Sequence, residues 1–415
     1  MKNRIAFLGI LSFVVHPISG FILSLLNIRS KSTAIVYISF AMLFGYSISF
    51  ADSSSDSSRY AEAFSNFDNT LNFDAILTLY RSGELRDLYR LLLFYFVSLF
   101  SHNPKVMYAF AGLIFGIFSY LSLRIFVKES ERKLDFFFFI LAIIFYTLVS
   151  LTNINSFRFN TGAVLLFYSI YQLIIQKKNS WLIGILITPY FHYGFILVVP
   201  VYIIYKFIET FFYTKEKVKS ILFYLFVISF SASWFLKTNS ISLGFLSNTD
   251  VISGAVANRV EFINSADVAD LVQNRKENSL FLSVQKYFDY GIKIFVFFSI
   301  FLIKDLIKRM SGDKTEYTKL FALVLFLYIF AFIAVSFPSG ARFLAIAHLF
   351  LILLLSKLYS IYQESDIKRI IVFALPVFSF QIAFVNFMAP TMFLSQTFWY
   401  GNVFWLLIEG WDFVT

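Results

Sequence analysis

Long, continuous runs of apolar residues dominate this chain and decide its fold class. Three of these runs lie near residues 104–126, 135–152 and 342–360. A helix that spans a bilayer needs about 20 mostly apolar residues, whereas the strands of a membrane β-barrel alternate apolar and polar residues. The runs do not alternate, and 59% of all residues are hydrophobic while only 14% are charged. The sequence therefore predicts an all-α polytopic integral membrane protein.

The apolar runs also predict how many times the chain crosses the membrane. Residues 88–100 are apolar but short and contain Arg90, which favours a short amphipathic helix. Residues 180–208 are apolar throughout but contain Pro189 and Pro200. We expect about 11–12 membrane segments in a single transmembrane domain of residues 1–415. The simple spans are expected near 5–26, 33–50, 104–126, 135–152, 159–176, 220–236, 290–307, 318–336, 342–360 and 369–389.

Basic residues give the orientation. They gather in short connections near 29–31, 124–133, 177–178, 206–219, 304–319 and 357–369. Lys and Arg are enriched in cytoplasmic loops, so the net charge of +10 reflects topology rather than nucleic-acid binding. With these loops inside, 51–87 and 237–289 become two larger periplasmic loops. Residues 180–208 then form a hairpin of two short helices, the alternative being one long kinked helix.

Several chemistries are excluded by what the sequence lacks. It contains no cysteine, which rules out disulfides, zinc–thiolate sites and cysteine nucleophiles. It has no Gly-rich phosphate loop, no GxSxG elbow, and no His, Asp or Glu residues with convincing metal-ligand spacing. We therefore expect no cofactor, no metal ion and no nucleic-acid partner.

Three ionisable residues lie where hydrocarbon makes charge costly. Arg158 and Arg342 each begin a predicted span at its outer end, where Lys and Arg are scarce. His192 lies beside the break at Pro189, and freed backbone groups in a membrane lie against protein or a water-filled cavity. The alternatives are snorkelling arginines and a structural histidine. We favour function, because ionisable residues in membrane segments are functional by default.

Further polar side chains flank the same face. Asp56, Arg59 and Tyr60 lie just after the second span, and Tyr193 follows the histidine. A solvated loop is the alternative interpretation of the first three residues. A phosphate carried on a lipid tail would suit the whole set, because arginine binds phosphate bidentately and stays charged in a dry site.

A pair of arginines adds to this face. Arg86 and Arg90 are four residues apart and would share one side of the short amphipathic helix. Together they could bind a phosphate. Contact with anionic lipid headgroups is an equally good interpretation of the pair.

The order and spacing of these residues resemble the EpsG family, which comprises Wzy-type polymerases of bacterial O-antigen and exopolysaccharide. The resemblance covers roughly residues 30–380. The motifs that carry it are Asp56 with Arg59 and Tyr60, the turn Ser101–Pro104, Arg158 followed by Phe159–Ala163, the pair Lys177 and Lys178, the step Phe191–His192, and Arg342 with Pro376.

The resemblance implies a metal-independent glycosyltransferase at the periplasmic face of a bacterial inner membrane. It would join oligosaccharide repeat units linked to undecaprenyl diphosphate, which serve as donor and acceptor. Displacement in one step would make the enzyme inverting. Arg158 and Arg342 would stabilise the leaving pyrophosphate, and His192 or Asp56 would be the general base. Membrane lipid and a chain-length regulator protein are further expected partners. The alternatives are a lipid-linked glycan ligase and a non-enzymatic polysaccharide transporter or flippase.

Overall fold

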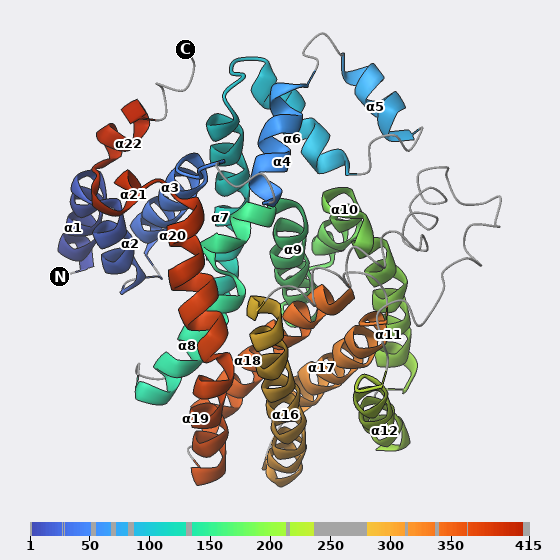
Figure 1. The fold of residues 1–415 in the computed structure, drawn as a ribbon. Helices are drawn as coiled ribbons and strands as arrows, with labels where there is room; N and C mark the ends of the chain where they lie inside the picture. Colours follow the sequence, from blue (N-terminus) through green and yellow to red (C-terminus); the bar gives the residue numbers. More distant parts are fainter. Residues whose placement is uncertain are drawn as a thin grey trace.

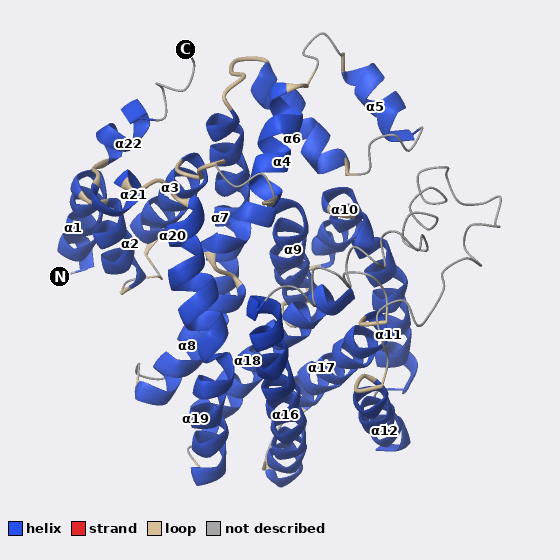
Figure 2. Ribbon diagram, in the orientation of Figure 1, coloured by secondary structure: helices blue, strands red, loops and turns tan. Residues whose placement is uncertain are grey.

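The fold is helical throughout the part of the chain that the structure describes. The computed structural model describes residues 2–26, 28, 30–50, 55–67, 72–81, 87–129, 135–212, 216–235, 280–311, 314–336, 340–362 and 364–409. Within these ranges every regular element is a helix and no strand is drawn (Figure 2). The all-α prediction is therefore confirmed for the described residues.

The helices follow one another in the order shown in Figure 1. The N-terminal half contains α1 (Lys2–Val15), α2 (Pro17–Leu25), α3 (Lys31–Tyr46), α4 (Asp56–Ser65), α5 (Phe73–Arg81), α6 (Leu88–Ser98), α7 (Pro104–Glu129), α8 (Phe136–Leu148), η1 (Leu151–Ser156), α9 (Phe157–Ile174), η2 (Asn179–Trp181), α10 (Leu182–Phe191) and η3 (Tyr193–Leu197). The C-terminal half contains α11 (Val198–Phe212), α12 (Glu216–Ala232), α16 (Leu280–Arg309), α17 (Thr315–Ala334), η4 (Gly340–Arg342), α18 (Phe343–Ile361), α19 (Ser365–Phe380), η5 (Gln381–Met388), α20 (Ala389–Phe393), α21 (Thr397–Tyr400) and α22 (Val403–Glu409).

The described part of the chain contains helices that are candidates for membrane spans. Five helical stretches are long and apolar enough to cross a bilayer. Shorter apolar helices cover Ser32–Tyr46, Leu88–Ser98 and Ser220–Ala232. The total of about 11–12 segments stays a prediction. The five stretches are Pro104–Glu129, Phe136–Ile174, Thr315–Ala334, Gly340–Ile361 and Ser365–Phe393.

The helix bundle has two polar ends, and each gathers residues that are distant in sequence. At one end Lys357 donates to Glu129 and, at 2.7 Å, to Glu316, while the Tyr171 hydroxyl donates to Glu129. These residues join α7, α9, α17 and α18 next to the predicted cytoplasmic loops, and we call this the inner end. At the other end α4, α6 and α9 meet around Arg158. We call this the outer end.

The first apolar run does not form the single span predicted over 5–26. It divides at His16, because Pro17 has no N–H with which to continue helix α1. The His16 ring caps α2 by accepting from Ser19 N at 3.3 Å. A Cβ at Gly20 would lie 2.3 Å from Phe13 Cα, so α2 turns back tightly onto α1. Each half is too short to cross a bilayer alone.

Helices also replace part of the two predicted periplasmic loops. Residues 51–87 include α4 and α5, because the serine run supplies a helix cap: Ser55 Oγ accepts from Ser58 N at 3.1 Å. The ring of Phe64 on α4 then packs edge-on against Phe94 of α6. Of 237–289, residues 237–279 lie outside the described part, and 280–289 form the start of α16.

The segment 180–208 is broken at His192. The backbone there is extended, with φ −152° and ψ 125°, between α10 and the short helix η3. Helix α10 runs antiparallel to α9, since its first turn lies against Ser169 and its last turn lies near Gly162. The break therefore lies beside the first turns of α9. The membrane hairpin itself stays a prediction.

Glycines let α3 and α7 approach very closely. A Cβ at Gly112 would lie 2.3 Å from the carbonyl oxygen of Ala41, and one at Gly45 would lie 2.1 Å from that of Tyr108. A Cβ at Gly116 would lie 2.5 Å from the Ala41 Cβ. Small residues spaced in this way permit backbone contact between membrane helices.

The N-terminal helices pack beside the C-terminal ones (Figure 1). An isolated antiparallel bridge joins Ile48 to Leu394. His16 Nε2 lies 3.1 Å from the carbonyl oxygen of Trp399, and the Tyr46 hydroxyl donates to that of Leu407 at 3.1 Å. The first and last parts of the described chain thus form one unit.

Candidate functional site

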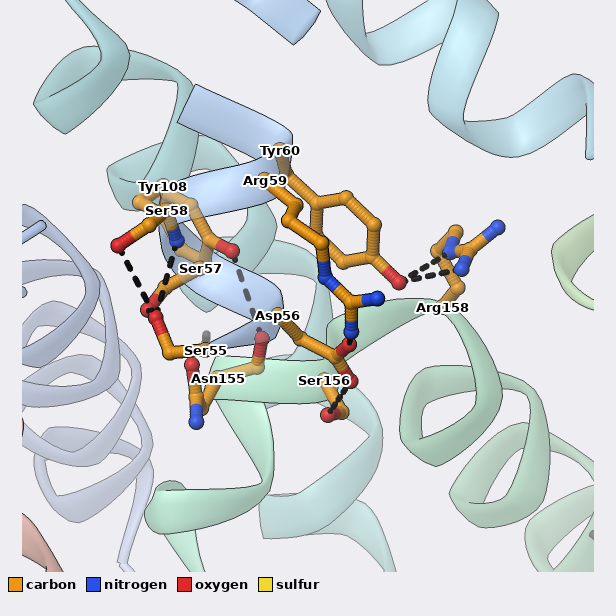
Figure 3. A network of polar contacts seen from close by, with 10 residues as sticks. All are labelled: Ser55, Asp56, Ser57, Ser58, Arg59, Tyr60, Tyr108, Asn155, Ser156 and Arg158. Atoms are coloured by element: carbon orange, nitrogen blue, oxygen red, sulfur yellow. Dashed lines mark hydrogen bonds and ion pairs between the residues drawn. The ribbon is translucent and has the colours of Figure 1, made fainter. Parts of the chain in front are cut away.

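Arg158 is the centre of the polar cluster at the outer end. It begins the first turn of α9, and the sequence places it where α9 follows directly on η1. Its Nε donates to the Tyr60 hydroxyl at 2.8 Å, and its Nη2 donates to the same oxygen (Figure 3). Its Nη1 forms an ion pair with Asp87. Three of the five guanidinium N–H groups therefore have fixed partners.

Tyr60 lies between two arginines. The Arg158 guanidinium carbon is 4.6 Å from the centre of its ring, and that of Arg90 is 6.0 Å away. Burial raises the pKa of the Tyr60 hydroxyl above its ordinary value, and the Arg158 charge opposes this only in part. The hydroxyl is therefore neutral near pH 7, so it accepts from Arg158 and keeps a hydrogen to donate.

Asp87 is a site residue that the sequence analysis missed. Its side chain is 1% exposed, and it precedes α6 at the position where aspartate commonly caps a helix. It makes no capping hydrogen bond there. Instead one oxygen pairs with Arg158 and the other accepts from Tyr193 N at 3.1 Å. An aspartate before an apolar helix is usually interpreted as a cap, and this hid its role.

Asp56 lies in the same cluster, as predicted for a residue after the second span. It is the first residue of α4, and it forms an ion pair with Arg59. Its other oxygen accepts from Ser156 Oγ at 2.5 Å (Figure 3). The carboxylate side chain is 25% exposed, so another molecule can reach it. Ser156 is a second partner that sequence reasoning did not single out.

His192 and Arg342 contact a common aromatic ring. The His192 ring meets Phe159 edge-on, with centroids 5.4 Å apart, and the Arg342 guanidinium carbon lies 5.7 Å from the Phe159 centre. Phe159 follows Arg158 by one residue in α9. Gly194 N donates to His192 Nδ1 at 3.1 Å, which places the proton of the neutral imidazole on Nε2.

The predicted residues are thus mostly brought together. Tyr60 contacts Arg158 directly, Asp87 links Arg158 to the backbone of Tyr193, and Asp56 joins the cluster through Ser156, two residues before Arg158. Arg342 joins through Phe159 and is exposed. Arg90 approaches through the Tyr60 ring. Arg86 lies outside the described residues, so its pairing with Arg90 stays a prediction.

Metal-ligand groups are absent from the part of the chain that the structure describes: no three His, Asp or Glu residues gather there as a metal site would require. A polar cavity of about 720 Å³ lies at the inner end, among Glu129, Gln176, Glu316 and Lys357. It belongs to the opposite end of the bundle from Arg158. Comparisons with models of protein families, with curated proteins and with solved structures found no match to this chain.

Proposed function

We propose that this chain is a membrane glycosyltransferase that polymerises oligosaccharide repeat units carried on undecaprenyl diphosphate, at the periplasmic face of a bacterial inner membrane. The observation that carries the proposal is the held guanidinium of Arg158. Three of its N–H groups are fixed by Tyr60 and Asp87. The remaining two can bind an anion in a set direction.

A diphosphate is the anion class that this arrangement favours. The Arg158 side chain is 21% exposed while that of its partner Asp87 is buried, with 1% exposed. An incoming anion can therefore reach the Arg158 guanidinium and not the Asp87 carboxylate. Arginine stays protonated in a low-dielectric site and matches phosphate oxygens with its planar fork. The exposed Arg342 lies beyond Phe159 and would bind the second phosphate or the second lipid-linked substrate.

The geometry supports a division of the proposed acid–base roles. Because His192 Nδ1 accepts from Gly194 N, the other ring nitrogen, Nε2, is the one that carries a hydrogen to donate. Asp56 is then the better base, since it is partly exposed and can accept a proton.

In the proposed step the acceptor hydroxyl oxygen bonds to the anomeric carbon of the donor. The bond from that carbon to the diphosphate oxygen breaks, and the diphosphate leaves with the electron pair. The hydroxyl proton passes to Asp56. Arg158 stabilises the charge that develops on the leaving group, and displacement in one step inverts the anomeric centre.

The proposed topology places this chemistry outside. The outer end carries the site, and the inner end borders the basic loops that the sequence predicts to be cytoplasmic. Helices α10 and α11 would form the short hairpin whose apex, at His192, reaches the site from the inner side.

The test is the size distribution of surface glycan in cells that lack this protein, restored by plasmid-borne variants. Deletion should replace the polymer ladder with single repeat units. Arg158→Lys should lower polymer formation about 100-fold or more, because the fork is lost. Arg309→Lys is the control, since Arg309 also pairs with carboxylates, Asp305 and Glu364, but at the inner end.

Other results would identify other functions. A full ladder in the Arg158→Lys strain would refute the proposed arginine site. If single units do not reach the surface in the deletion strain, the polymerase proposal fails. Repeat units that accumulate on the carrier outside the membrane would then indicate a ligase, and those that accumulate inside would indicate a flippase.

A further inference from the structure

We propose that Asp87 is a positioning residue that holds Arg158 and the His192 turn in one fixed arrangement. The inference rests on the proposed function of Arg158 as the anion ligand. It adds a residue that neither the sequence motifs nor the resemblance single out.

The two carboxylate oxygens bind two separate segments. One pairs with Nη1 of Arg158 in the first turn of α9, and the other accepts from Tyr193 N at 3.1 Å, directly after the break at His192. Asp87 itself belongs to a third segment, the start of α6. A single carboxylate therefore joins the two elements that carry the proposed anion ligand and the proposed donor.

The directions of the remaining Arg158 donors depend on this contact. Tyr60 holds the Nε and Nη2 side of the guanidinium, and Asp87 holds Nη1. With Tyr60 and Asp87 both present, the guanidinium plane of Arg158 cannot rotate. Without Asp87 the side chain would keep only its contacts to one oxygen atom, and its free N–H groups would lose their direction.

The ion pair at the inner end provides a matched comparison. Lys357 pairs with Glu129 at side-chain exposures of 8% and 12%, against 21% and 1% for Arg158 and Asp87. Both are largely buried pairs that join distant helices. Of these two pairs, only the outer one also holds the backbone of a helix break, and in that pair the cation is more exposed than its partner.

The first experiment measures pyrophosphate binding by the purified full chain in detergent, together with its thermal unfolding. Asp87→Asn keeps an oxygen that can accept from Tyr193 N but removes the charge opposite Arg158. We expect Asp87→Asn to weaken pyrophosphate affinity about 100-fold, the scale that a misplacement of about 1 Å can cause. Asp87→Glu should restore part of this loss. Glu129→Gln should lower the unfolding temperature and leave affinity unchanged.

Unchanged or tighter pyrophosphate binding by Asp87→Asn would overturn the proposal, because the carboxylate would then only neutralise Arg158. Equal loss of affinity in Glu129→Gln and Asp87→Asn would overturn it too, because general destabilisation would explain both.

The second experiment tests the contact to the turn and does not alter Asp87. Tyr193 is the first residue of η3, where proline's fixed φ is suitable, and His192 before it is already extended. Tyr193→Pro removes the N–H and the phenol, while Tyr193→Ala removes the phenol only. We expect Tyr193→Pro to form about tenfold less polymer than Tyr193→Ala, within the scale of misplaced groups. Equal polymer from the two variants would overturn the coupling.

Arg158→Ala separates this inference from the proposed function. If Arg158→Ala keeps a full polymer ladder, the proposed anion site itself is wrong. If Arg158→Ala loses the ladder while Asp87→Asn and Tyr193→Pro keep it, the site stands and the role of Asp87 is refuted.

Discussion

Substituting Gly112 by alanine sets two effects of opposite sign against each other. Alanine is favoured over glycine inside a helix by about 1 kcal/mol, so propensity alone predicts a more stable protein. The structure predicts the reverse, because the new Cβ would lie 2.3 Å from the Ala41 carbonyl oxygen, and ordinary contact begins at 3.4 Å. Helices α3 and α7 would have to separate by roughly 1 Å, and overpacking of this kind costs about 1–3 kcal/mol.

The net expectation for Gly112→Ala is a loss of roughly 1 kcal/mol, and up to roughly 2 kcal/mol, in the free energy of unfolding. The assay is thermal unfolding of the purified protein in detergent. Gly45→Ala should behave alike, since its Cβ would meet the Tyr108 carbonyl oxygen at 2.1 Å. Gly9→Ala is the control, because nothing lies within 4 Å of its Cβ. A Gly112→Ala protein that unfolds at or above the wild-type temperature would refute the packing argument.

Three further predictions follow from other contacts. Tyr60→Phe removes the acceptor of two Arg158 N–H groups and should reduce the amount of polymer in the surface-glycan assay. Because burial raises the pKa of Tyr60, the pH dependence of the wild-type rate should show no tyrosine ionisation below about pH 10. A step at lower pH that Tyr60→Phe abolishes would contradict this expectation. Gly162→Ala should lower polymer yield, because its Cβ would lie 2.5 Å from Cε2 of the fully buried Phe195, and Phe195 stacks on Phe159. A wild-type polymer yield would show that the Phe195 and Phe159 rings do not position the site. Lys357→Met should lower the free energy of unfolding by about 3–5 kcal/mol in thermal or chemical unfolding, because it leaves Glu129 buried without its cation. The double variant with Glu129→Gln should recover most of this loss, and failure to recover it would contradict the ion-pair explanation.

The long helices and several site residues could be predicted from sequence because each leaves a local signal. Continuous apolar runs predict spans near 104–126 and 318–336, where the structure has the long helices Pro104–Glu129 and Thr315–Ala334. Arg158 stands out because a charge begins a membrane segment, and His192 stands out because it lies beside a proline. The structure places both at the outer end with Asp56 and Tyr60.

The misses have identifiable physical causes. The role of Asp87 depends on partners 71 and 106 residues away, which no local pattern records, and its position imitates a helix cap. The break at His16 did have a local signal, since Pro17 follows directly, but the surrounding run is apolar enough to predict one span. Helix α4 was hidden because its capping serines are also typical of loops.

The packing of the N-terminal helices against the C-terminal ones has a consequence for synthesis of the protein. Tyr46, the last residue of α3, contacts Leu407, and Ile48 just after it bridges to Leu394, so both partners lie more than three hundred residues later. At about 5–20 residues per second, ribosomes add the later segment roughly 20–70 s after the earlier one. During that interval the backbone of Ile48 lacks its bridge partner Leu394, and the His16 ring lacks the Trp399 carbonyl that it later contacts. Both groups are then exposed to the insertion machinery or to other nascent chains. Truncation before Leu394 should therefore yield a protein that is captured by membrane quality control, even though every residue of the outer-end cluster has been made.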